Sequence, residues 1–232
     1  RLIVDLEKDP SGAHRIQHVS LQDRKVLFES IHIVDGKKVN HVGLTCVQFD
    51  YEADGNKITA TGPGRLEMNN QAVSAVSRSD RPFSLEQPCF AYMEGFDQLV
   101  WNLDRNDVRA YGKDSIYLNY WPFESGRPGD QVIVQCAHAQ AQFDSAAEGK
   151  SELASLAASG GVSYREEKPG GRTLQGDSLT YSRDGGWVVI EGSEARPCKV
   201  DTVTVPMIQY HPETGQIKTQ LSTSPSVMPD FR

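Results

Sequence analysis

The sequence repeats one short unit, in which two strands of alternating apolar and polar residues flank a turn rich in glycine, asparagine or aspartate. In the clearest copy, Leu179 and Tyr181 lie on one face of the first strand. A turn follows at residues 183–186, after which Val188 and Ile190 lie on one face of the second strand. Period-two alternation between glycine-rich turns is typical of half-buried antiparallel strands. Its recurrence predicts an architecture of stacked hairpins.

The unit occurs at residues 46–62, 139–160, 176–192 and 205–220, with a looser copy at residues 99–112. The shared order is a small residue, an alternating strand, an aromatic residue, a polar turn, a second strand and usually a glycine. A glycine that closes each unit predicts a bulge or a sharp bend between layers. The sequence therefore predicts an all-β antiparallel sheet built from repeated hairpins.

One apolar face of these hairpins is expected to point inward. The residues expected on that face are Val47, Phe49, Ile58, Leu179, Tyr181, Val188, Ile190, Ile208, Tyr210 and Ile217. Two interpretations are open for them, either an open apolar groove or a closed core, because both bury the same apolar alternation.

Two segments interrupt this pattern. Residues 145–158 have the composition of a helix, but their apolar residues alternate, so we predict a strand over 152–158. Residues 69–87 are polar and predict a long loop or an irregular crossing. We expect one elongated domain over residues 1–221, or two stacked halves at 1–121 and 131–221, followed by a flexible tail at 222–232.

Charge and hydropathy exclude some classes of function. The net charge of −7 disfavours nucleic-acid binding, which needs a basic face for phosphates. No apolar run approaches the roughly 18 residues that span a bilayer as a helix. The first residue is Arg1, and we expect that a signal peptide or anchor has been removed.

The sequence shows no catalytic or metal-binding motif. GxSxG, P-loop, HExxH and GxGxxG patterns are absent, and we expect neither an enzyme nor a cofactor. Cys46, Cys89, Cys136 and Cys198 are far apart, without the close ligand pair of zinc sites. One or two disulfides and four buried free thiols are both compatible with this spacing.

Several of the units resemble a known family. Residues 49–68, FDYEADGNKITATGPGRLEM, and residues 156–195 are similar to the OstA-like, or LptA-like, repeats of lipopolysaccharide-transport proteins. The resemblance includes the strand Ala158-Ser159-Gly160-Gly161-Val162, which has one residue more than the family pattern, and the G-D-x-L-x-Y segment at 176–181. It is clearest over residues 142–221 and 46–68, and weak over 69–131 and before His41.

The resemblance implies a β-jellyroll, also called a β-taco, in which a folded-over sheet encloses an apolar groove. It also implies a non-enzymatic protein of outer-membrane biogenesis, periplasmic or attached to the envelope. Such a protein would carry the acyl chains of lipopolysaccharide or a similar lipid. Its partners would be other β-jellyroll proteins, or further copies of itself, stacked through edge strands.

Two other classes of function share the strand pattern. A carbohydrate-binding or adhesive β-sandwich at the cell surface would present an aromatic platform on its outer face. An enzyme on a β scaffold, such as a polysaccharide lyase, would align carboxylates or basic residues on consecutive strands, and no such alignment occurs in the sequence.

Overall fold

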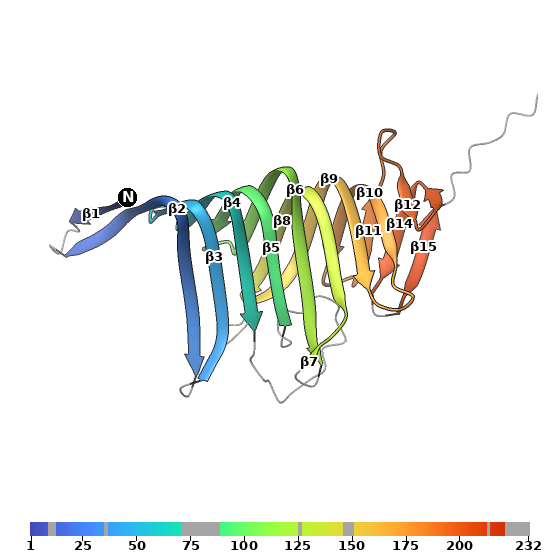
Figure 1. The fold of residues 1–232 in the computed structure, drawn as a ribbon, viewed down its shortest axis with the longest axis horizontal. Coiled ribbons are helices and arrows are strands. Elements are labelled where there is room, and N and C mark those ends of the chain that lie inside the picture. The colour runs from blue at the N-terminus through green and yellow to red at the C-terminus, as the bar shows by residue number, and fades with distance from the viewer. Residues whose placement is uncertain are drawn as a thin grey trace, which may run out of the picture.

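The computed structural model of the protein is one antiparallel sheet whose strands follow one another in space almost in chain order (Figure 1). It describes residues 1–8, 13–34, 37–70, 89–124, 127–145, 151–212 and 214–220. The strands are β1 (Leu2–Lys8), β2 (His14–Val34), β3 (Lys37–Glu52), β4 (Lys57–Asn70), β5 (Cys89–Asn102), β6 (Asp107–Glu124), β7 (Arg127–Pro128), β8 (Gln131–Ser145), β9 (Ser151–Glu167), β10 (Thr173–Ser182), β11 (Val188–Glu191), β12 (Cys198–Val200), β13 (Val203–Val205), β14 (Met207–His211) and β15 (Gln216–Gln220). The described residues contain no helix, which confirms the prediction of an all-β, folded-over sheet.

The sheet folds over along a line of bulges that crosses consecutive strands. We call this line the crease. Register shifts mark it at Gln22/Val26, Thr45/Gln48, Thr61/Gly64, Glu94/Gln98, Tyr111/Ile116, Gln135/His138 and Gly176/Ser178. A bulge bends its strand and increases the local twist. Because the bulges are in register, the bends add up and the strands arch over along one side of the molecule (Figure 1).

The crease divides the sheet into two arms. Arm A comprises residues 1–8, 14–22, 48–61, 98–111, 138–145, 151–159 and 178–182 with β11, β14 and β15. Arm B comprises residues 26–34, 37–46, 64–70, 89–94, 116–124, 131–135, 162–167 and 173–176 with β12 and β13. At the C-terminal end the two arms are built from separate short strands, because β11 and β14 pair in arm A while β12 and β13 pair in arm B.

Glycines occupy the crease because a side chain there would collide with nearby residues of the same strand or of the neighbouring strand. A Cβ atom on Gly112 would lie 2.7 Å from Cγ1 of Ile116 and 3.1 Å from the carbonyl oxygen of Gly95. At Gly160, where φ is +86°, a Cβ would lie 2.6 Å from that of Ala137. The glycines that close the repeated units therefore stand at bends, as the sequence predicts.

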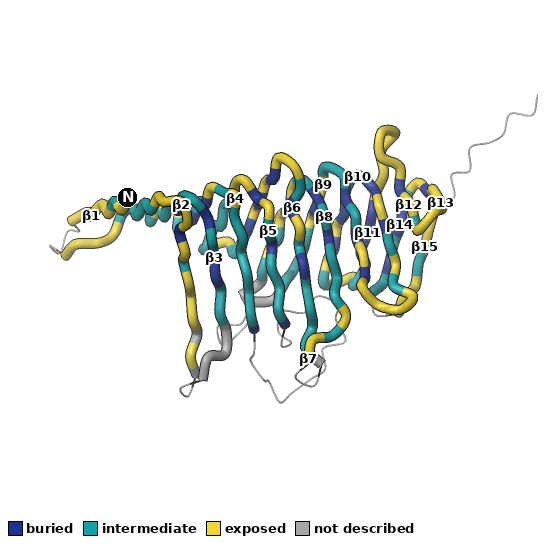
Figure 2. Tube along the Cα trace, in the orientation of Figure 1, coloured by how far each residue is buried: buried dark blue, intermediate teal, exposed yellow. Residues whose placement is uncertain are grey.

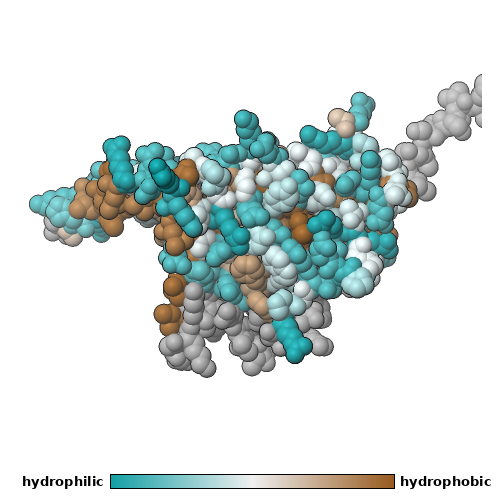
Figure 3. Space-filling model, viewed as in Figure 1, coloured by the Kyte–Doolittle hydropathy of each residue, from teal (hydrophilic) through white to brown (hydrophobic). Residues whose placement is uncertain are grey.

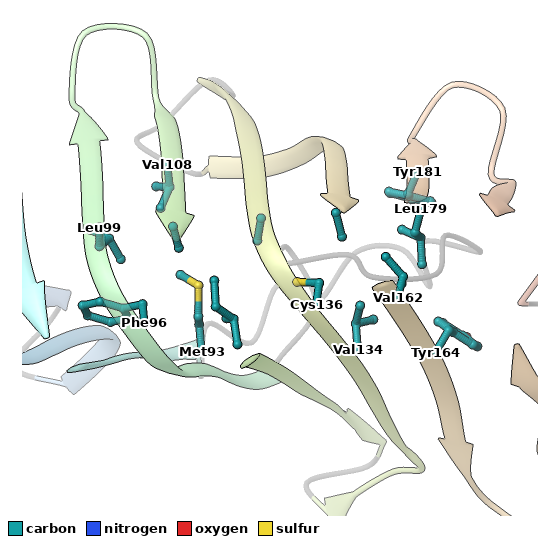
Figure 4. Close-up of a cluster of buried hydrophobic side chains, with 14 of the residues drawn as sticks. Met93, Phe96, Leu99, Val108, Val134, Cys136, Val162, Tyr164, Leu179 and Tyr181 are labelled. Carbon is teal, nitrogen blue, oxygen red and sulfur yellow. The ribbon is translucent and has the colours of Figure 1, made fainter. Parts of the chain in front are cut away.

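The hydrophobic core lies between the arms. In arm A, one unbroken row of opposed, buried residues crosses nine strands: Phe49, Ala60, Leu99, Ala110, Ala139, Ala158, Leu179, Ile190 and Ile208. In arm B, the corresponding row is Leu44, Leu66, Met93, Leu118, Val134, Tyr164 and Leu174. Figure 4 shows members of both rows pointing into the space between the arms, and Figure 2 shows burial concentrated along the middle of the sheet. Each fully buried large apolar side chain contributes about 1.5–3 kcal/mol to folding.

The strands are longer than the sequence pattern suggests. Residues 57–70 form one strand that continues through Pro63 and Gly64. The strand predicted over 152–158 is confirmed within β9. β6 and β8 pair directly. The sheet is therefore continuous between residues 1–121 and residues 131–221, the two stacked halves that the sequence left open as an alternative. Most of the expected loop at 69–87 and the expected tail at 222–232 lie outside the described residues.

The crease predicts a stability difference between two glycine-to-alanine substitutions. Gly112→Ala is expected to destabilise the fold by about 1–3 kcal/mol, because its Cβ would press on buried Ile116. Gly55→Ala is the matched control, since its Cβ would have 3.8 Å to its nearest neighbour. Urea unfolding of both variants measures the difference. Equal stabilities would contradict a tightly packed crease.

Candidate functional site

An apolar cavity of about 160 Å³ lies between the arms in the middle of the sheet. It is partly open to solvent. Arm B lines it with Leu66, Met68, Ala91, Tyr92, Met93, Leu118, Asn119, Tyr120, Val132 and Val134, and arm A lines it with Val108, Ala141, Phe143, Leu153 and Leu156. Pockets with such walls bind apolar groups, because burial removes hydrocarbon surface from water.

Small side chains leave the space for this cavity. Ala110 and Ala139 are adjacent in the buried row of arm A, and Ala141 follows Val108 in the next row toward the open margin. Ala91 is the smallest lining residue on the facing arm. Longer side chains at the same row positions, such as Leu179 and Ile190, fill the C-terminal part of the space. The cavity is therefore confined to the centre of the sheet.

Nine of the ten residues predicted for the apolar face point between the arms, all from arm A. Phe49, Ile58, Leu179, Tyr181, Val188, Ile190, Ile208 and Tyr210 are buried in the core, and Ile217 packs against it half-buried. None of the ten lines the cavity. The sequence thus identified residues of arm A near the two ends of the sheet, whereas the cavity lies in the middle, between β4 and β9.

Val47 is placed differently from the prediction. It lies at the crease, half-buried and outside the core cluster, between buried Cys46 and buried Phe49. The register of β3 shifts between Thr45 and Gln48, and this bulge breaks the alternation that links Val47 to Phe49 in the sequence.

A buried carboxylate joins the two arms on the C-terminal side of the cavity. Glu166 of arm B is only 6% exposed. Its Oε1 accepts hydrogen bonds from the Tyr210 hydroxyl of arm A at 2.7 Å and from the Tyr164 hydroxyl at 3.0 Å. The Nζ atom of Lys168 lies 3.2 Å from Oε2. This cluster, which we call the clamp, pairs a charge that would otherwise be costly to bury.

The clamp also shifts the ionisation of its tyrosines. Burial, together with the hydrogen bond to Glu166, raises the pKa of Tyr210 above its usual value. Burial raises the pKa of Tyr164 in the same direction, and the negative charge of Glu166 adds to the effect. The rings of Tyr164 and Tyr210 meet edge to face, with centroids 5.8 Å apart. Sequence reasoning placed Tyr210 on the inner face but missed Glu166, which alternation puts on the same side of β9 as Tyr164.

The four cysteines are free and buried. Burial raises the pKa of the Cys46 thiol to about 11 and that of Cys89 and Cys136 to about 12. It raises the pKa of Cys198 as well. Of the two alternatives that the spacing left open, the structure therefore has free thiols rather than disulfides.

The N-terminal end of the sheet exposes apolar side chains. Leu2, Val4, Leu6 and Ile16 are 63%, 45%, 57% and 52% exposed. Leu2 lies opposite Leu21, which packs against the core, so this surface continues the inner face beyond the closed part of the fold. Leu27, Ile31 and Ile33 on β2 are also exposed. Figure 3 shows both groups as brown surface at the left of the molecule.

Metal and membrane signals are absent from the described ranges. Within them, no cluster of three or more His, Cys, Asp or Glu side chains is arranged to hold a metal ion. His18 contacts Asp5 at 3.1 Å and Asp50 at 3.7 Å. No helix in the part that the structure describes is long and apolar enough to cross a membrane.

Comparison with known proteins adds no assignment. No protein-family model matches the sequence, and no curated protein matches it either.

The clamp can be tested by removing one hydroxyl. Tyr210→Phe is expected to destabilise the protein by about 1–3 kcal/mol, because buried Glu166 loses a hydrogen-bond donor. Tyr111→Phe, on an exposed tyrosine, is the control and should change stability by less than about 0.5 kcal/mol.

The raised pKa values of Tyr164 and Tyr210 also predict how stability depends on pH. Above about pH 10 the unfolded chain loses these phenolic protons while the folded chain retains them, so stability falls as pH rises. Urea unfolding from pH 8 to pH 11 should show this fall, and a smaller fall in the Tyr210→Phe variant. An unchanged slope in the variant would contradict the role of Tyr210.

The buried thiols predict low reactivity. Because the thiolate is the reactive form, Ellman's reagent at pH 8 should leave the native protein almost unmodified. After denaturation without reductant, the four cysteines should all react. Fewer thiols in the denatured protein would reveal a disulfide, and rapid reaction of the native protein would contradict the burial.

Proposed function

We propose that this protein is a non-enzymatic lipid-binding protein of outer-membrane biogenesis. It holds acyl chains of lipopolysaccharide, or of a similar lipid, between the two arms of its folded sheet. The observation that supports the proposal most directly is the apolar cavity between the arms. The resemblance of the repeated units to OstA-like sequences supplies the class of lipid.

The walls of the cavity suit hydrocarbon. The lining side chains are aliphatic or aromatic except for Asn119, and they come from both arms. Each CH₂ group moved from water into such a space gains about 0.8 kcal/mol. A segment of a few methylene groups would therefore contribute several kcal/mol to binding.

The volume limits how much lipid the closed form holds. A cavity of about 150 Å³ lined by apolar side chains accommodates one benzene molecule. The cavity of about 160 Å³ thus accepts a short segment of one acyl chain. Several whole chains require the arms to separate. The clamp fixes the arms together only on the C-terminal side, at Tyr210 and Glu166.

The two ends of the sheet support association with similar sheets. β1 and β15 end the path of paired strands, and their outer edges are free within the described residues. Edges of this kind accept strands from a partner. In the proposal, β-jellyroll partners or further copies cover the apolar N-terminal surface around Val4 and extend the groove from one molecule to the next. A periplasmic or envelope location follows from the proposed cargo.

Photo-crosslinking from the cavity tests the proposal. We expect p-benzoylphenylalanine at Phe143, which lines the cavity, to form an adduct with lipopolysaccharide after irradiation. The same residue at Phe49 is the control, because Phe49 is a buried phenylalanine outside the cavity lining. Intact-mass spectrometry counts the adducts, and thermal unfolding confirms that both variants fold.

A second variant distinguishes lipid bound inside the cavity from lipid that only contacts the surface. Ala141→Leu fills part of the cavity and should lower the amount of lipid that crosslinks at position 143. No adduct at 143 would show that the space between the arms is a sealed core. Equal adducts at 143 and 49 would show that the lipid has no preference for the cavity.

A further inference from the structure

The outer face of arm B carries a second concave site, on the opposite side of the sheet from the cavity. Two adjacent rows of opposed residues form it across β5, β6, β8 and β9. One row is Tyr92, Asn119, Ile133 and Arg165, and the other is Glu94, Tyr117, Gln135 and Ser163. These eight residues line a shallow groove of about 250 Å³, which we call the outer groove.

Planar hydrogen-bonding groups form its floor and are held in place by neighbours. Asn119 is only 6% exposed, and its Oδ1 accepts a hydrogen bond from Nε2 of Gln131 at 2.8 Å. Nε2 of Gln135 donates to the hydroxyl of Ser115 at 3.0 Å. Side chains whose orientation is fixed before binding lose little conformational entropy when a ligand arrives.

Aromatic rings stand beside this floor. Tyr117 is 40% exposed, which is unusual for a large ring in the middle of a sheet. Tyr92 packs against Trp121 with centroids 5.5 Å apart, and Trp121 packs against Phe90 at 5.7 Å. The guanidinium of Arg65 lies 4.0 Å from the centre of the Tyr92 ring. The rings are therefore rigid and partly exposed.

The arginines around the outer groove are both paired with carboxylates. Arg65 lies 3.3 Å from Glu67 and 3.5 Å from Glu94, and Arg165 lies 2.7 Å from Glu167. Each arginine is thus neutralised by a carboxylate on the same face. A phosphate or another strong anion would have to compete with these carboxylates, so a neutral ligand with many hydroxyl groups fits better.

We propose that the outer groove binds a neutral oligosaccharide. A sugar ring has an apolar face of C–H groups and an edge of hydroxyls. The face would stack on Tyr117 or Tyr92, and the hydroxyls would bond to Asn119, Gln135 and Glu94. This site opens on the face of arm B opposite the lipid cavity, although Tyr92 and Asn119 contribute to the walls of both. Its ligand needs no acyl chain.

Amide NMR titration of the intact protein tests this site with maltohexaose, cellohexaose and mannohexaose at millimolar concentrations. We expect at least one of these hexaoses to shift amide signals of residues 117–119, 133–135 and 163–165. Tyr117→Ala should weaken its binding by about 3- to 10-fold, the range that one aromatic contact contributes. Gln135→Ala should also weaken binding, through the loss of a hydrogen-bonding group.

Tyr111→Ala is the matched control, since Tyr111 lies on arm A and is 42% exposed against 40% for Tyr117. It should leave saccharide binding unchanged. The proposal is overturned if none of the three hexaoses shifts these signals, if both arm B variants bind as tightly as the wild type, or if Tyr111→Ala weakens binding equally. Because the probes carry no lipid, their binding does not depend on the cavity between the arms.

Discussion

The rest of the structure depends on the crease. A flat sheet of this length would leave one apolar face in water. If the two arms were separate sheets, each long strand would be two strands joined by an additional loop. Bulges at matching positions bend each strand instead, and glycines such as Gly64 and Gly112 remove the Cβ atoms that would hold the strands apart. Burial of apolar surface between the arms then offsets the loss of ladder hydrogen bonds at the bulges.

In a sheet folded on itself, the packing between the arms at each point depends on the side chains that the two arms place there. Where residues such as Leu179 and Ile190 face Tyr164 and Leu174, the space is filled. Where alanines occupy the row, a cavity remains. The clamp of Glu166 with Tyr164 and Tyr210 lies on the filled side. One end is thereby tied by a buried polar cluster, while the centre stays apolar and hollow.

The two faces of arm B suit different ligands. Alternation places Met93 and Leu118 toward the cavity, and Tyr117 on the outside together with the polar residues of the next row. A lipid with a saccharide head group contains both chemistries, hydrocarbon for the inner face and hydroxyls for the outer face. The two proposed sites share Tyr92 and Asn119 in their walls but open on opposite faces of arm B, and they are tested by separate ligands.

The sequence by itself determined the all-β class, the hairpin positions, the bends at glycines and the parts of the inward face of arm A toward its two ends. These features follow from the two-residue period of a strand and from glycine's tolerance of close backbone approach, which are local properties. Bulges limited this reasoning, because one extra residue shifts the alternation and displaces Val47 from the inner face.

The tertiary structure decided which rows face each other. The cavity lining, the pairing of Glu166 with Tyr210 across 44 residues of chain, and the outer groove all depend on the register of strands that are distant in sequence. Register and packing between arms are set by the whole sheet at once, and no single hairpin carries that information.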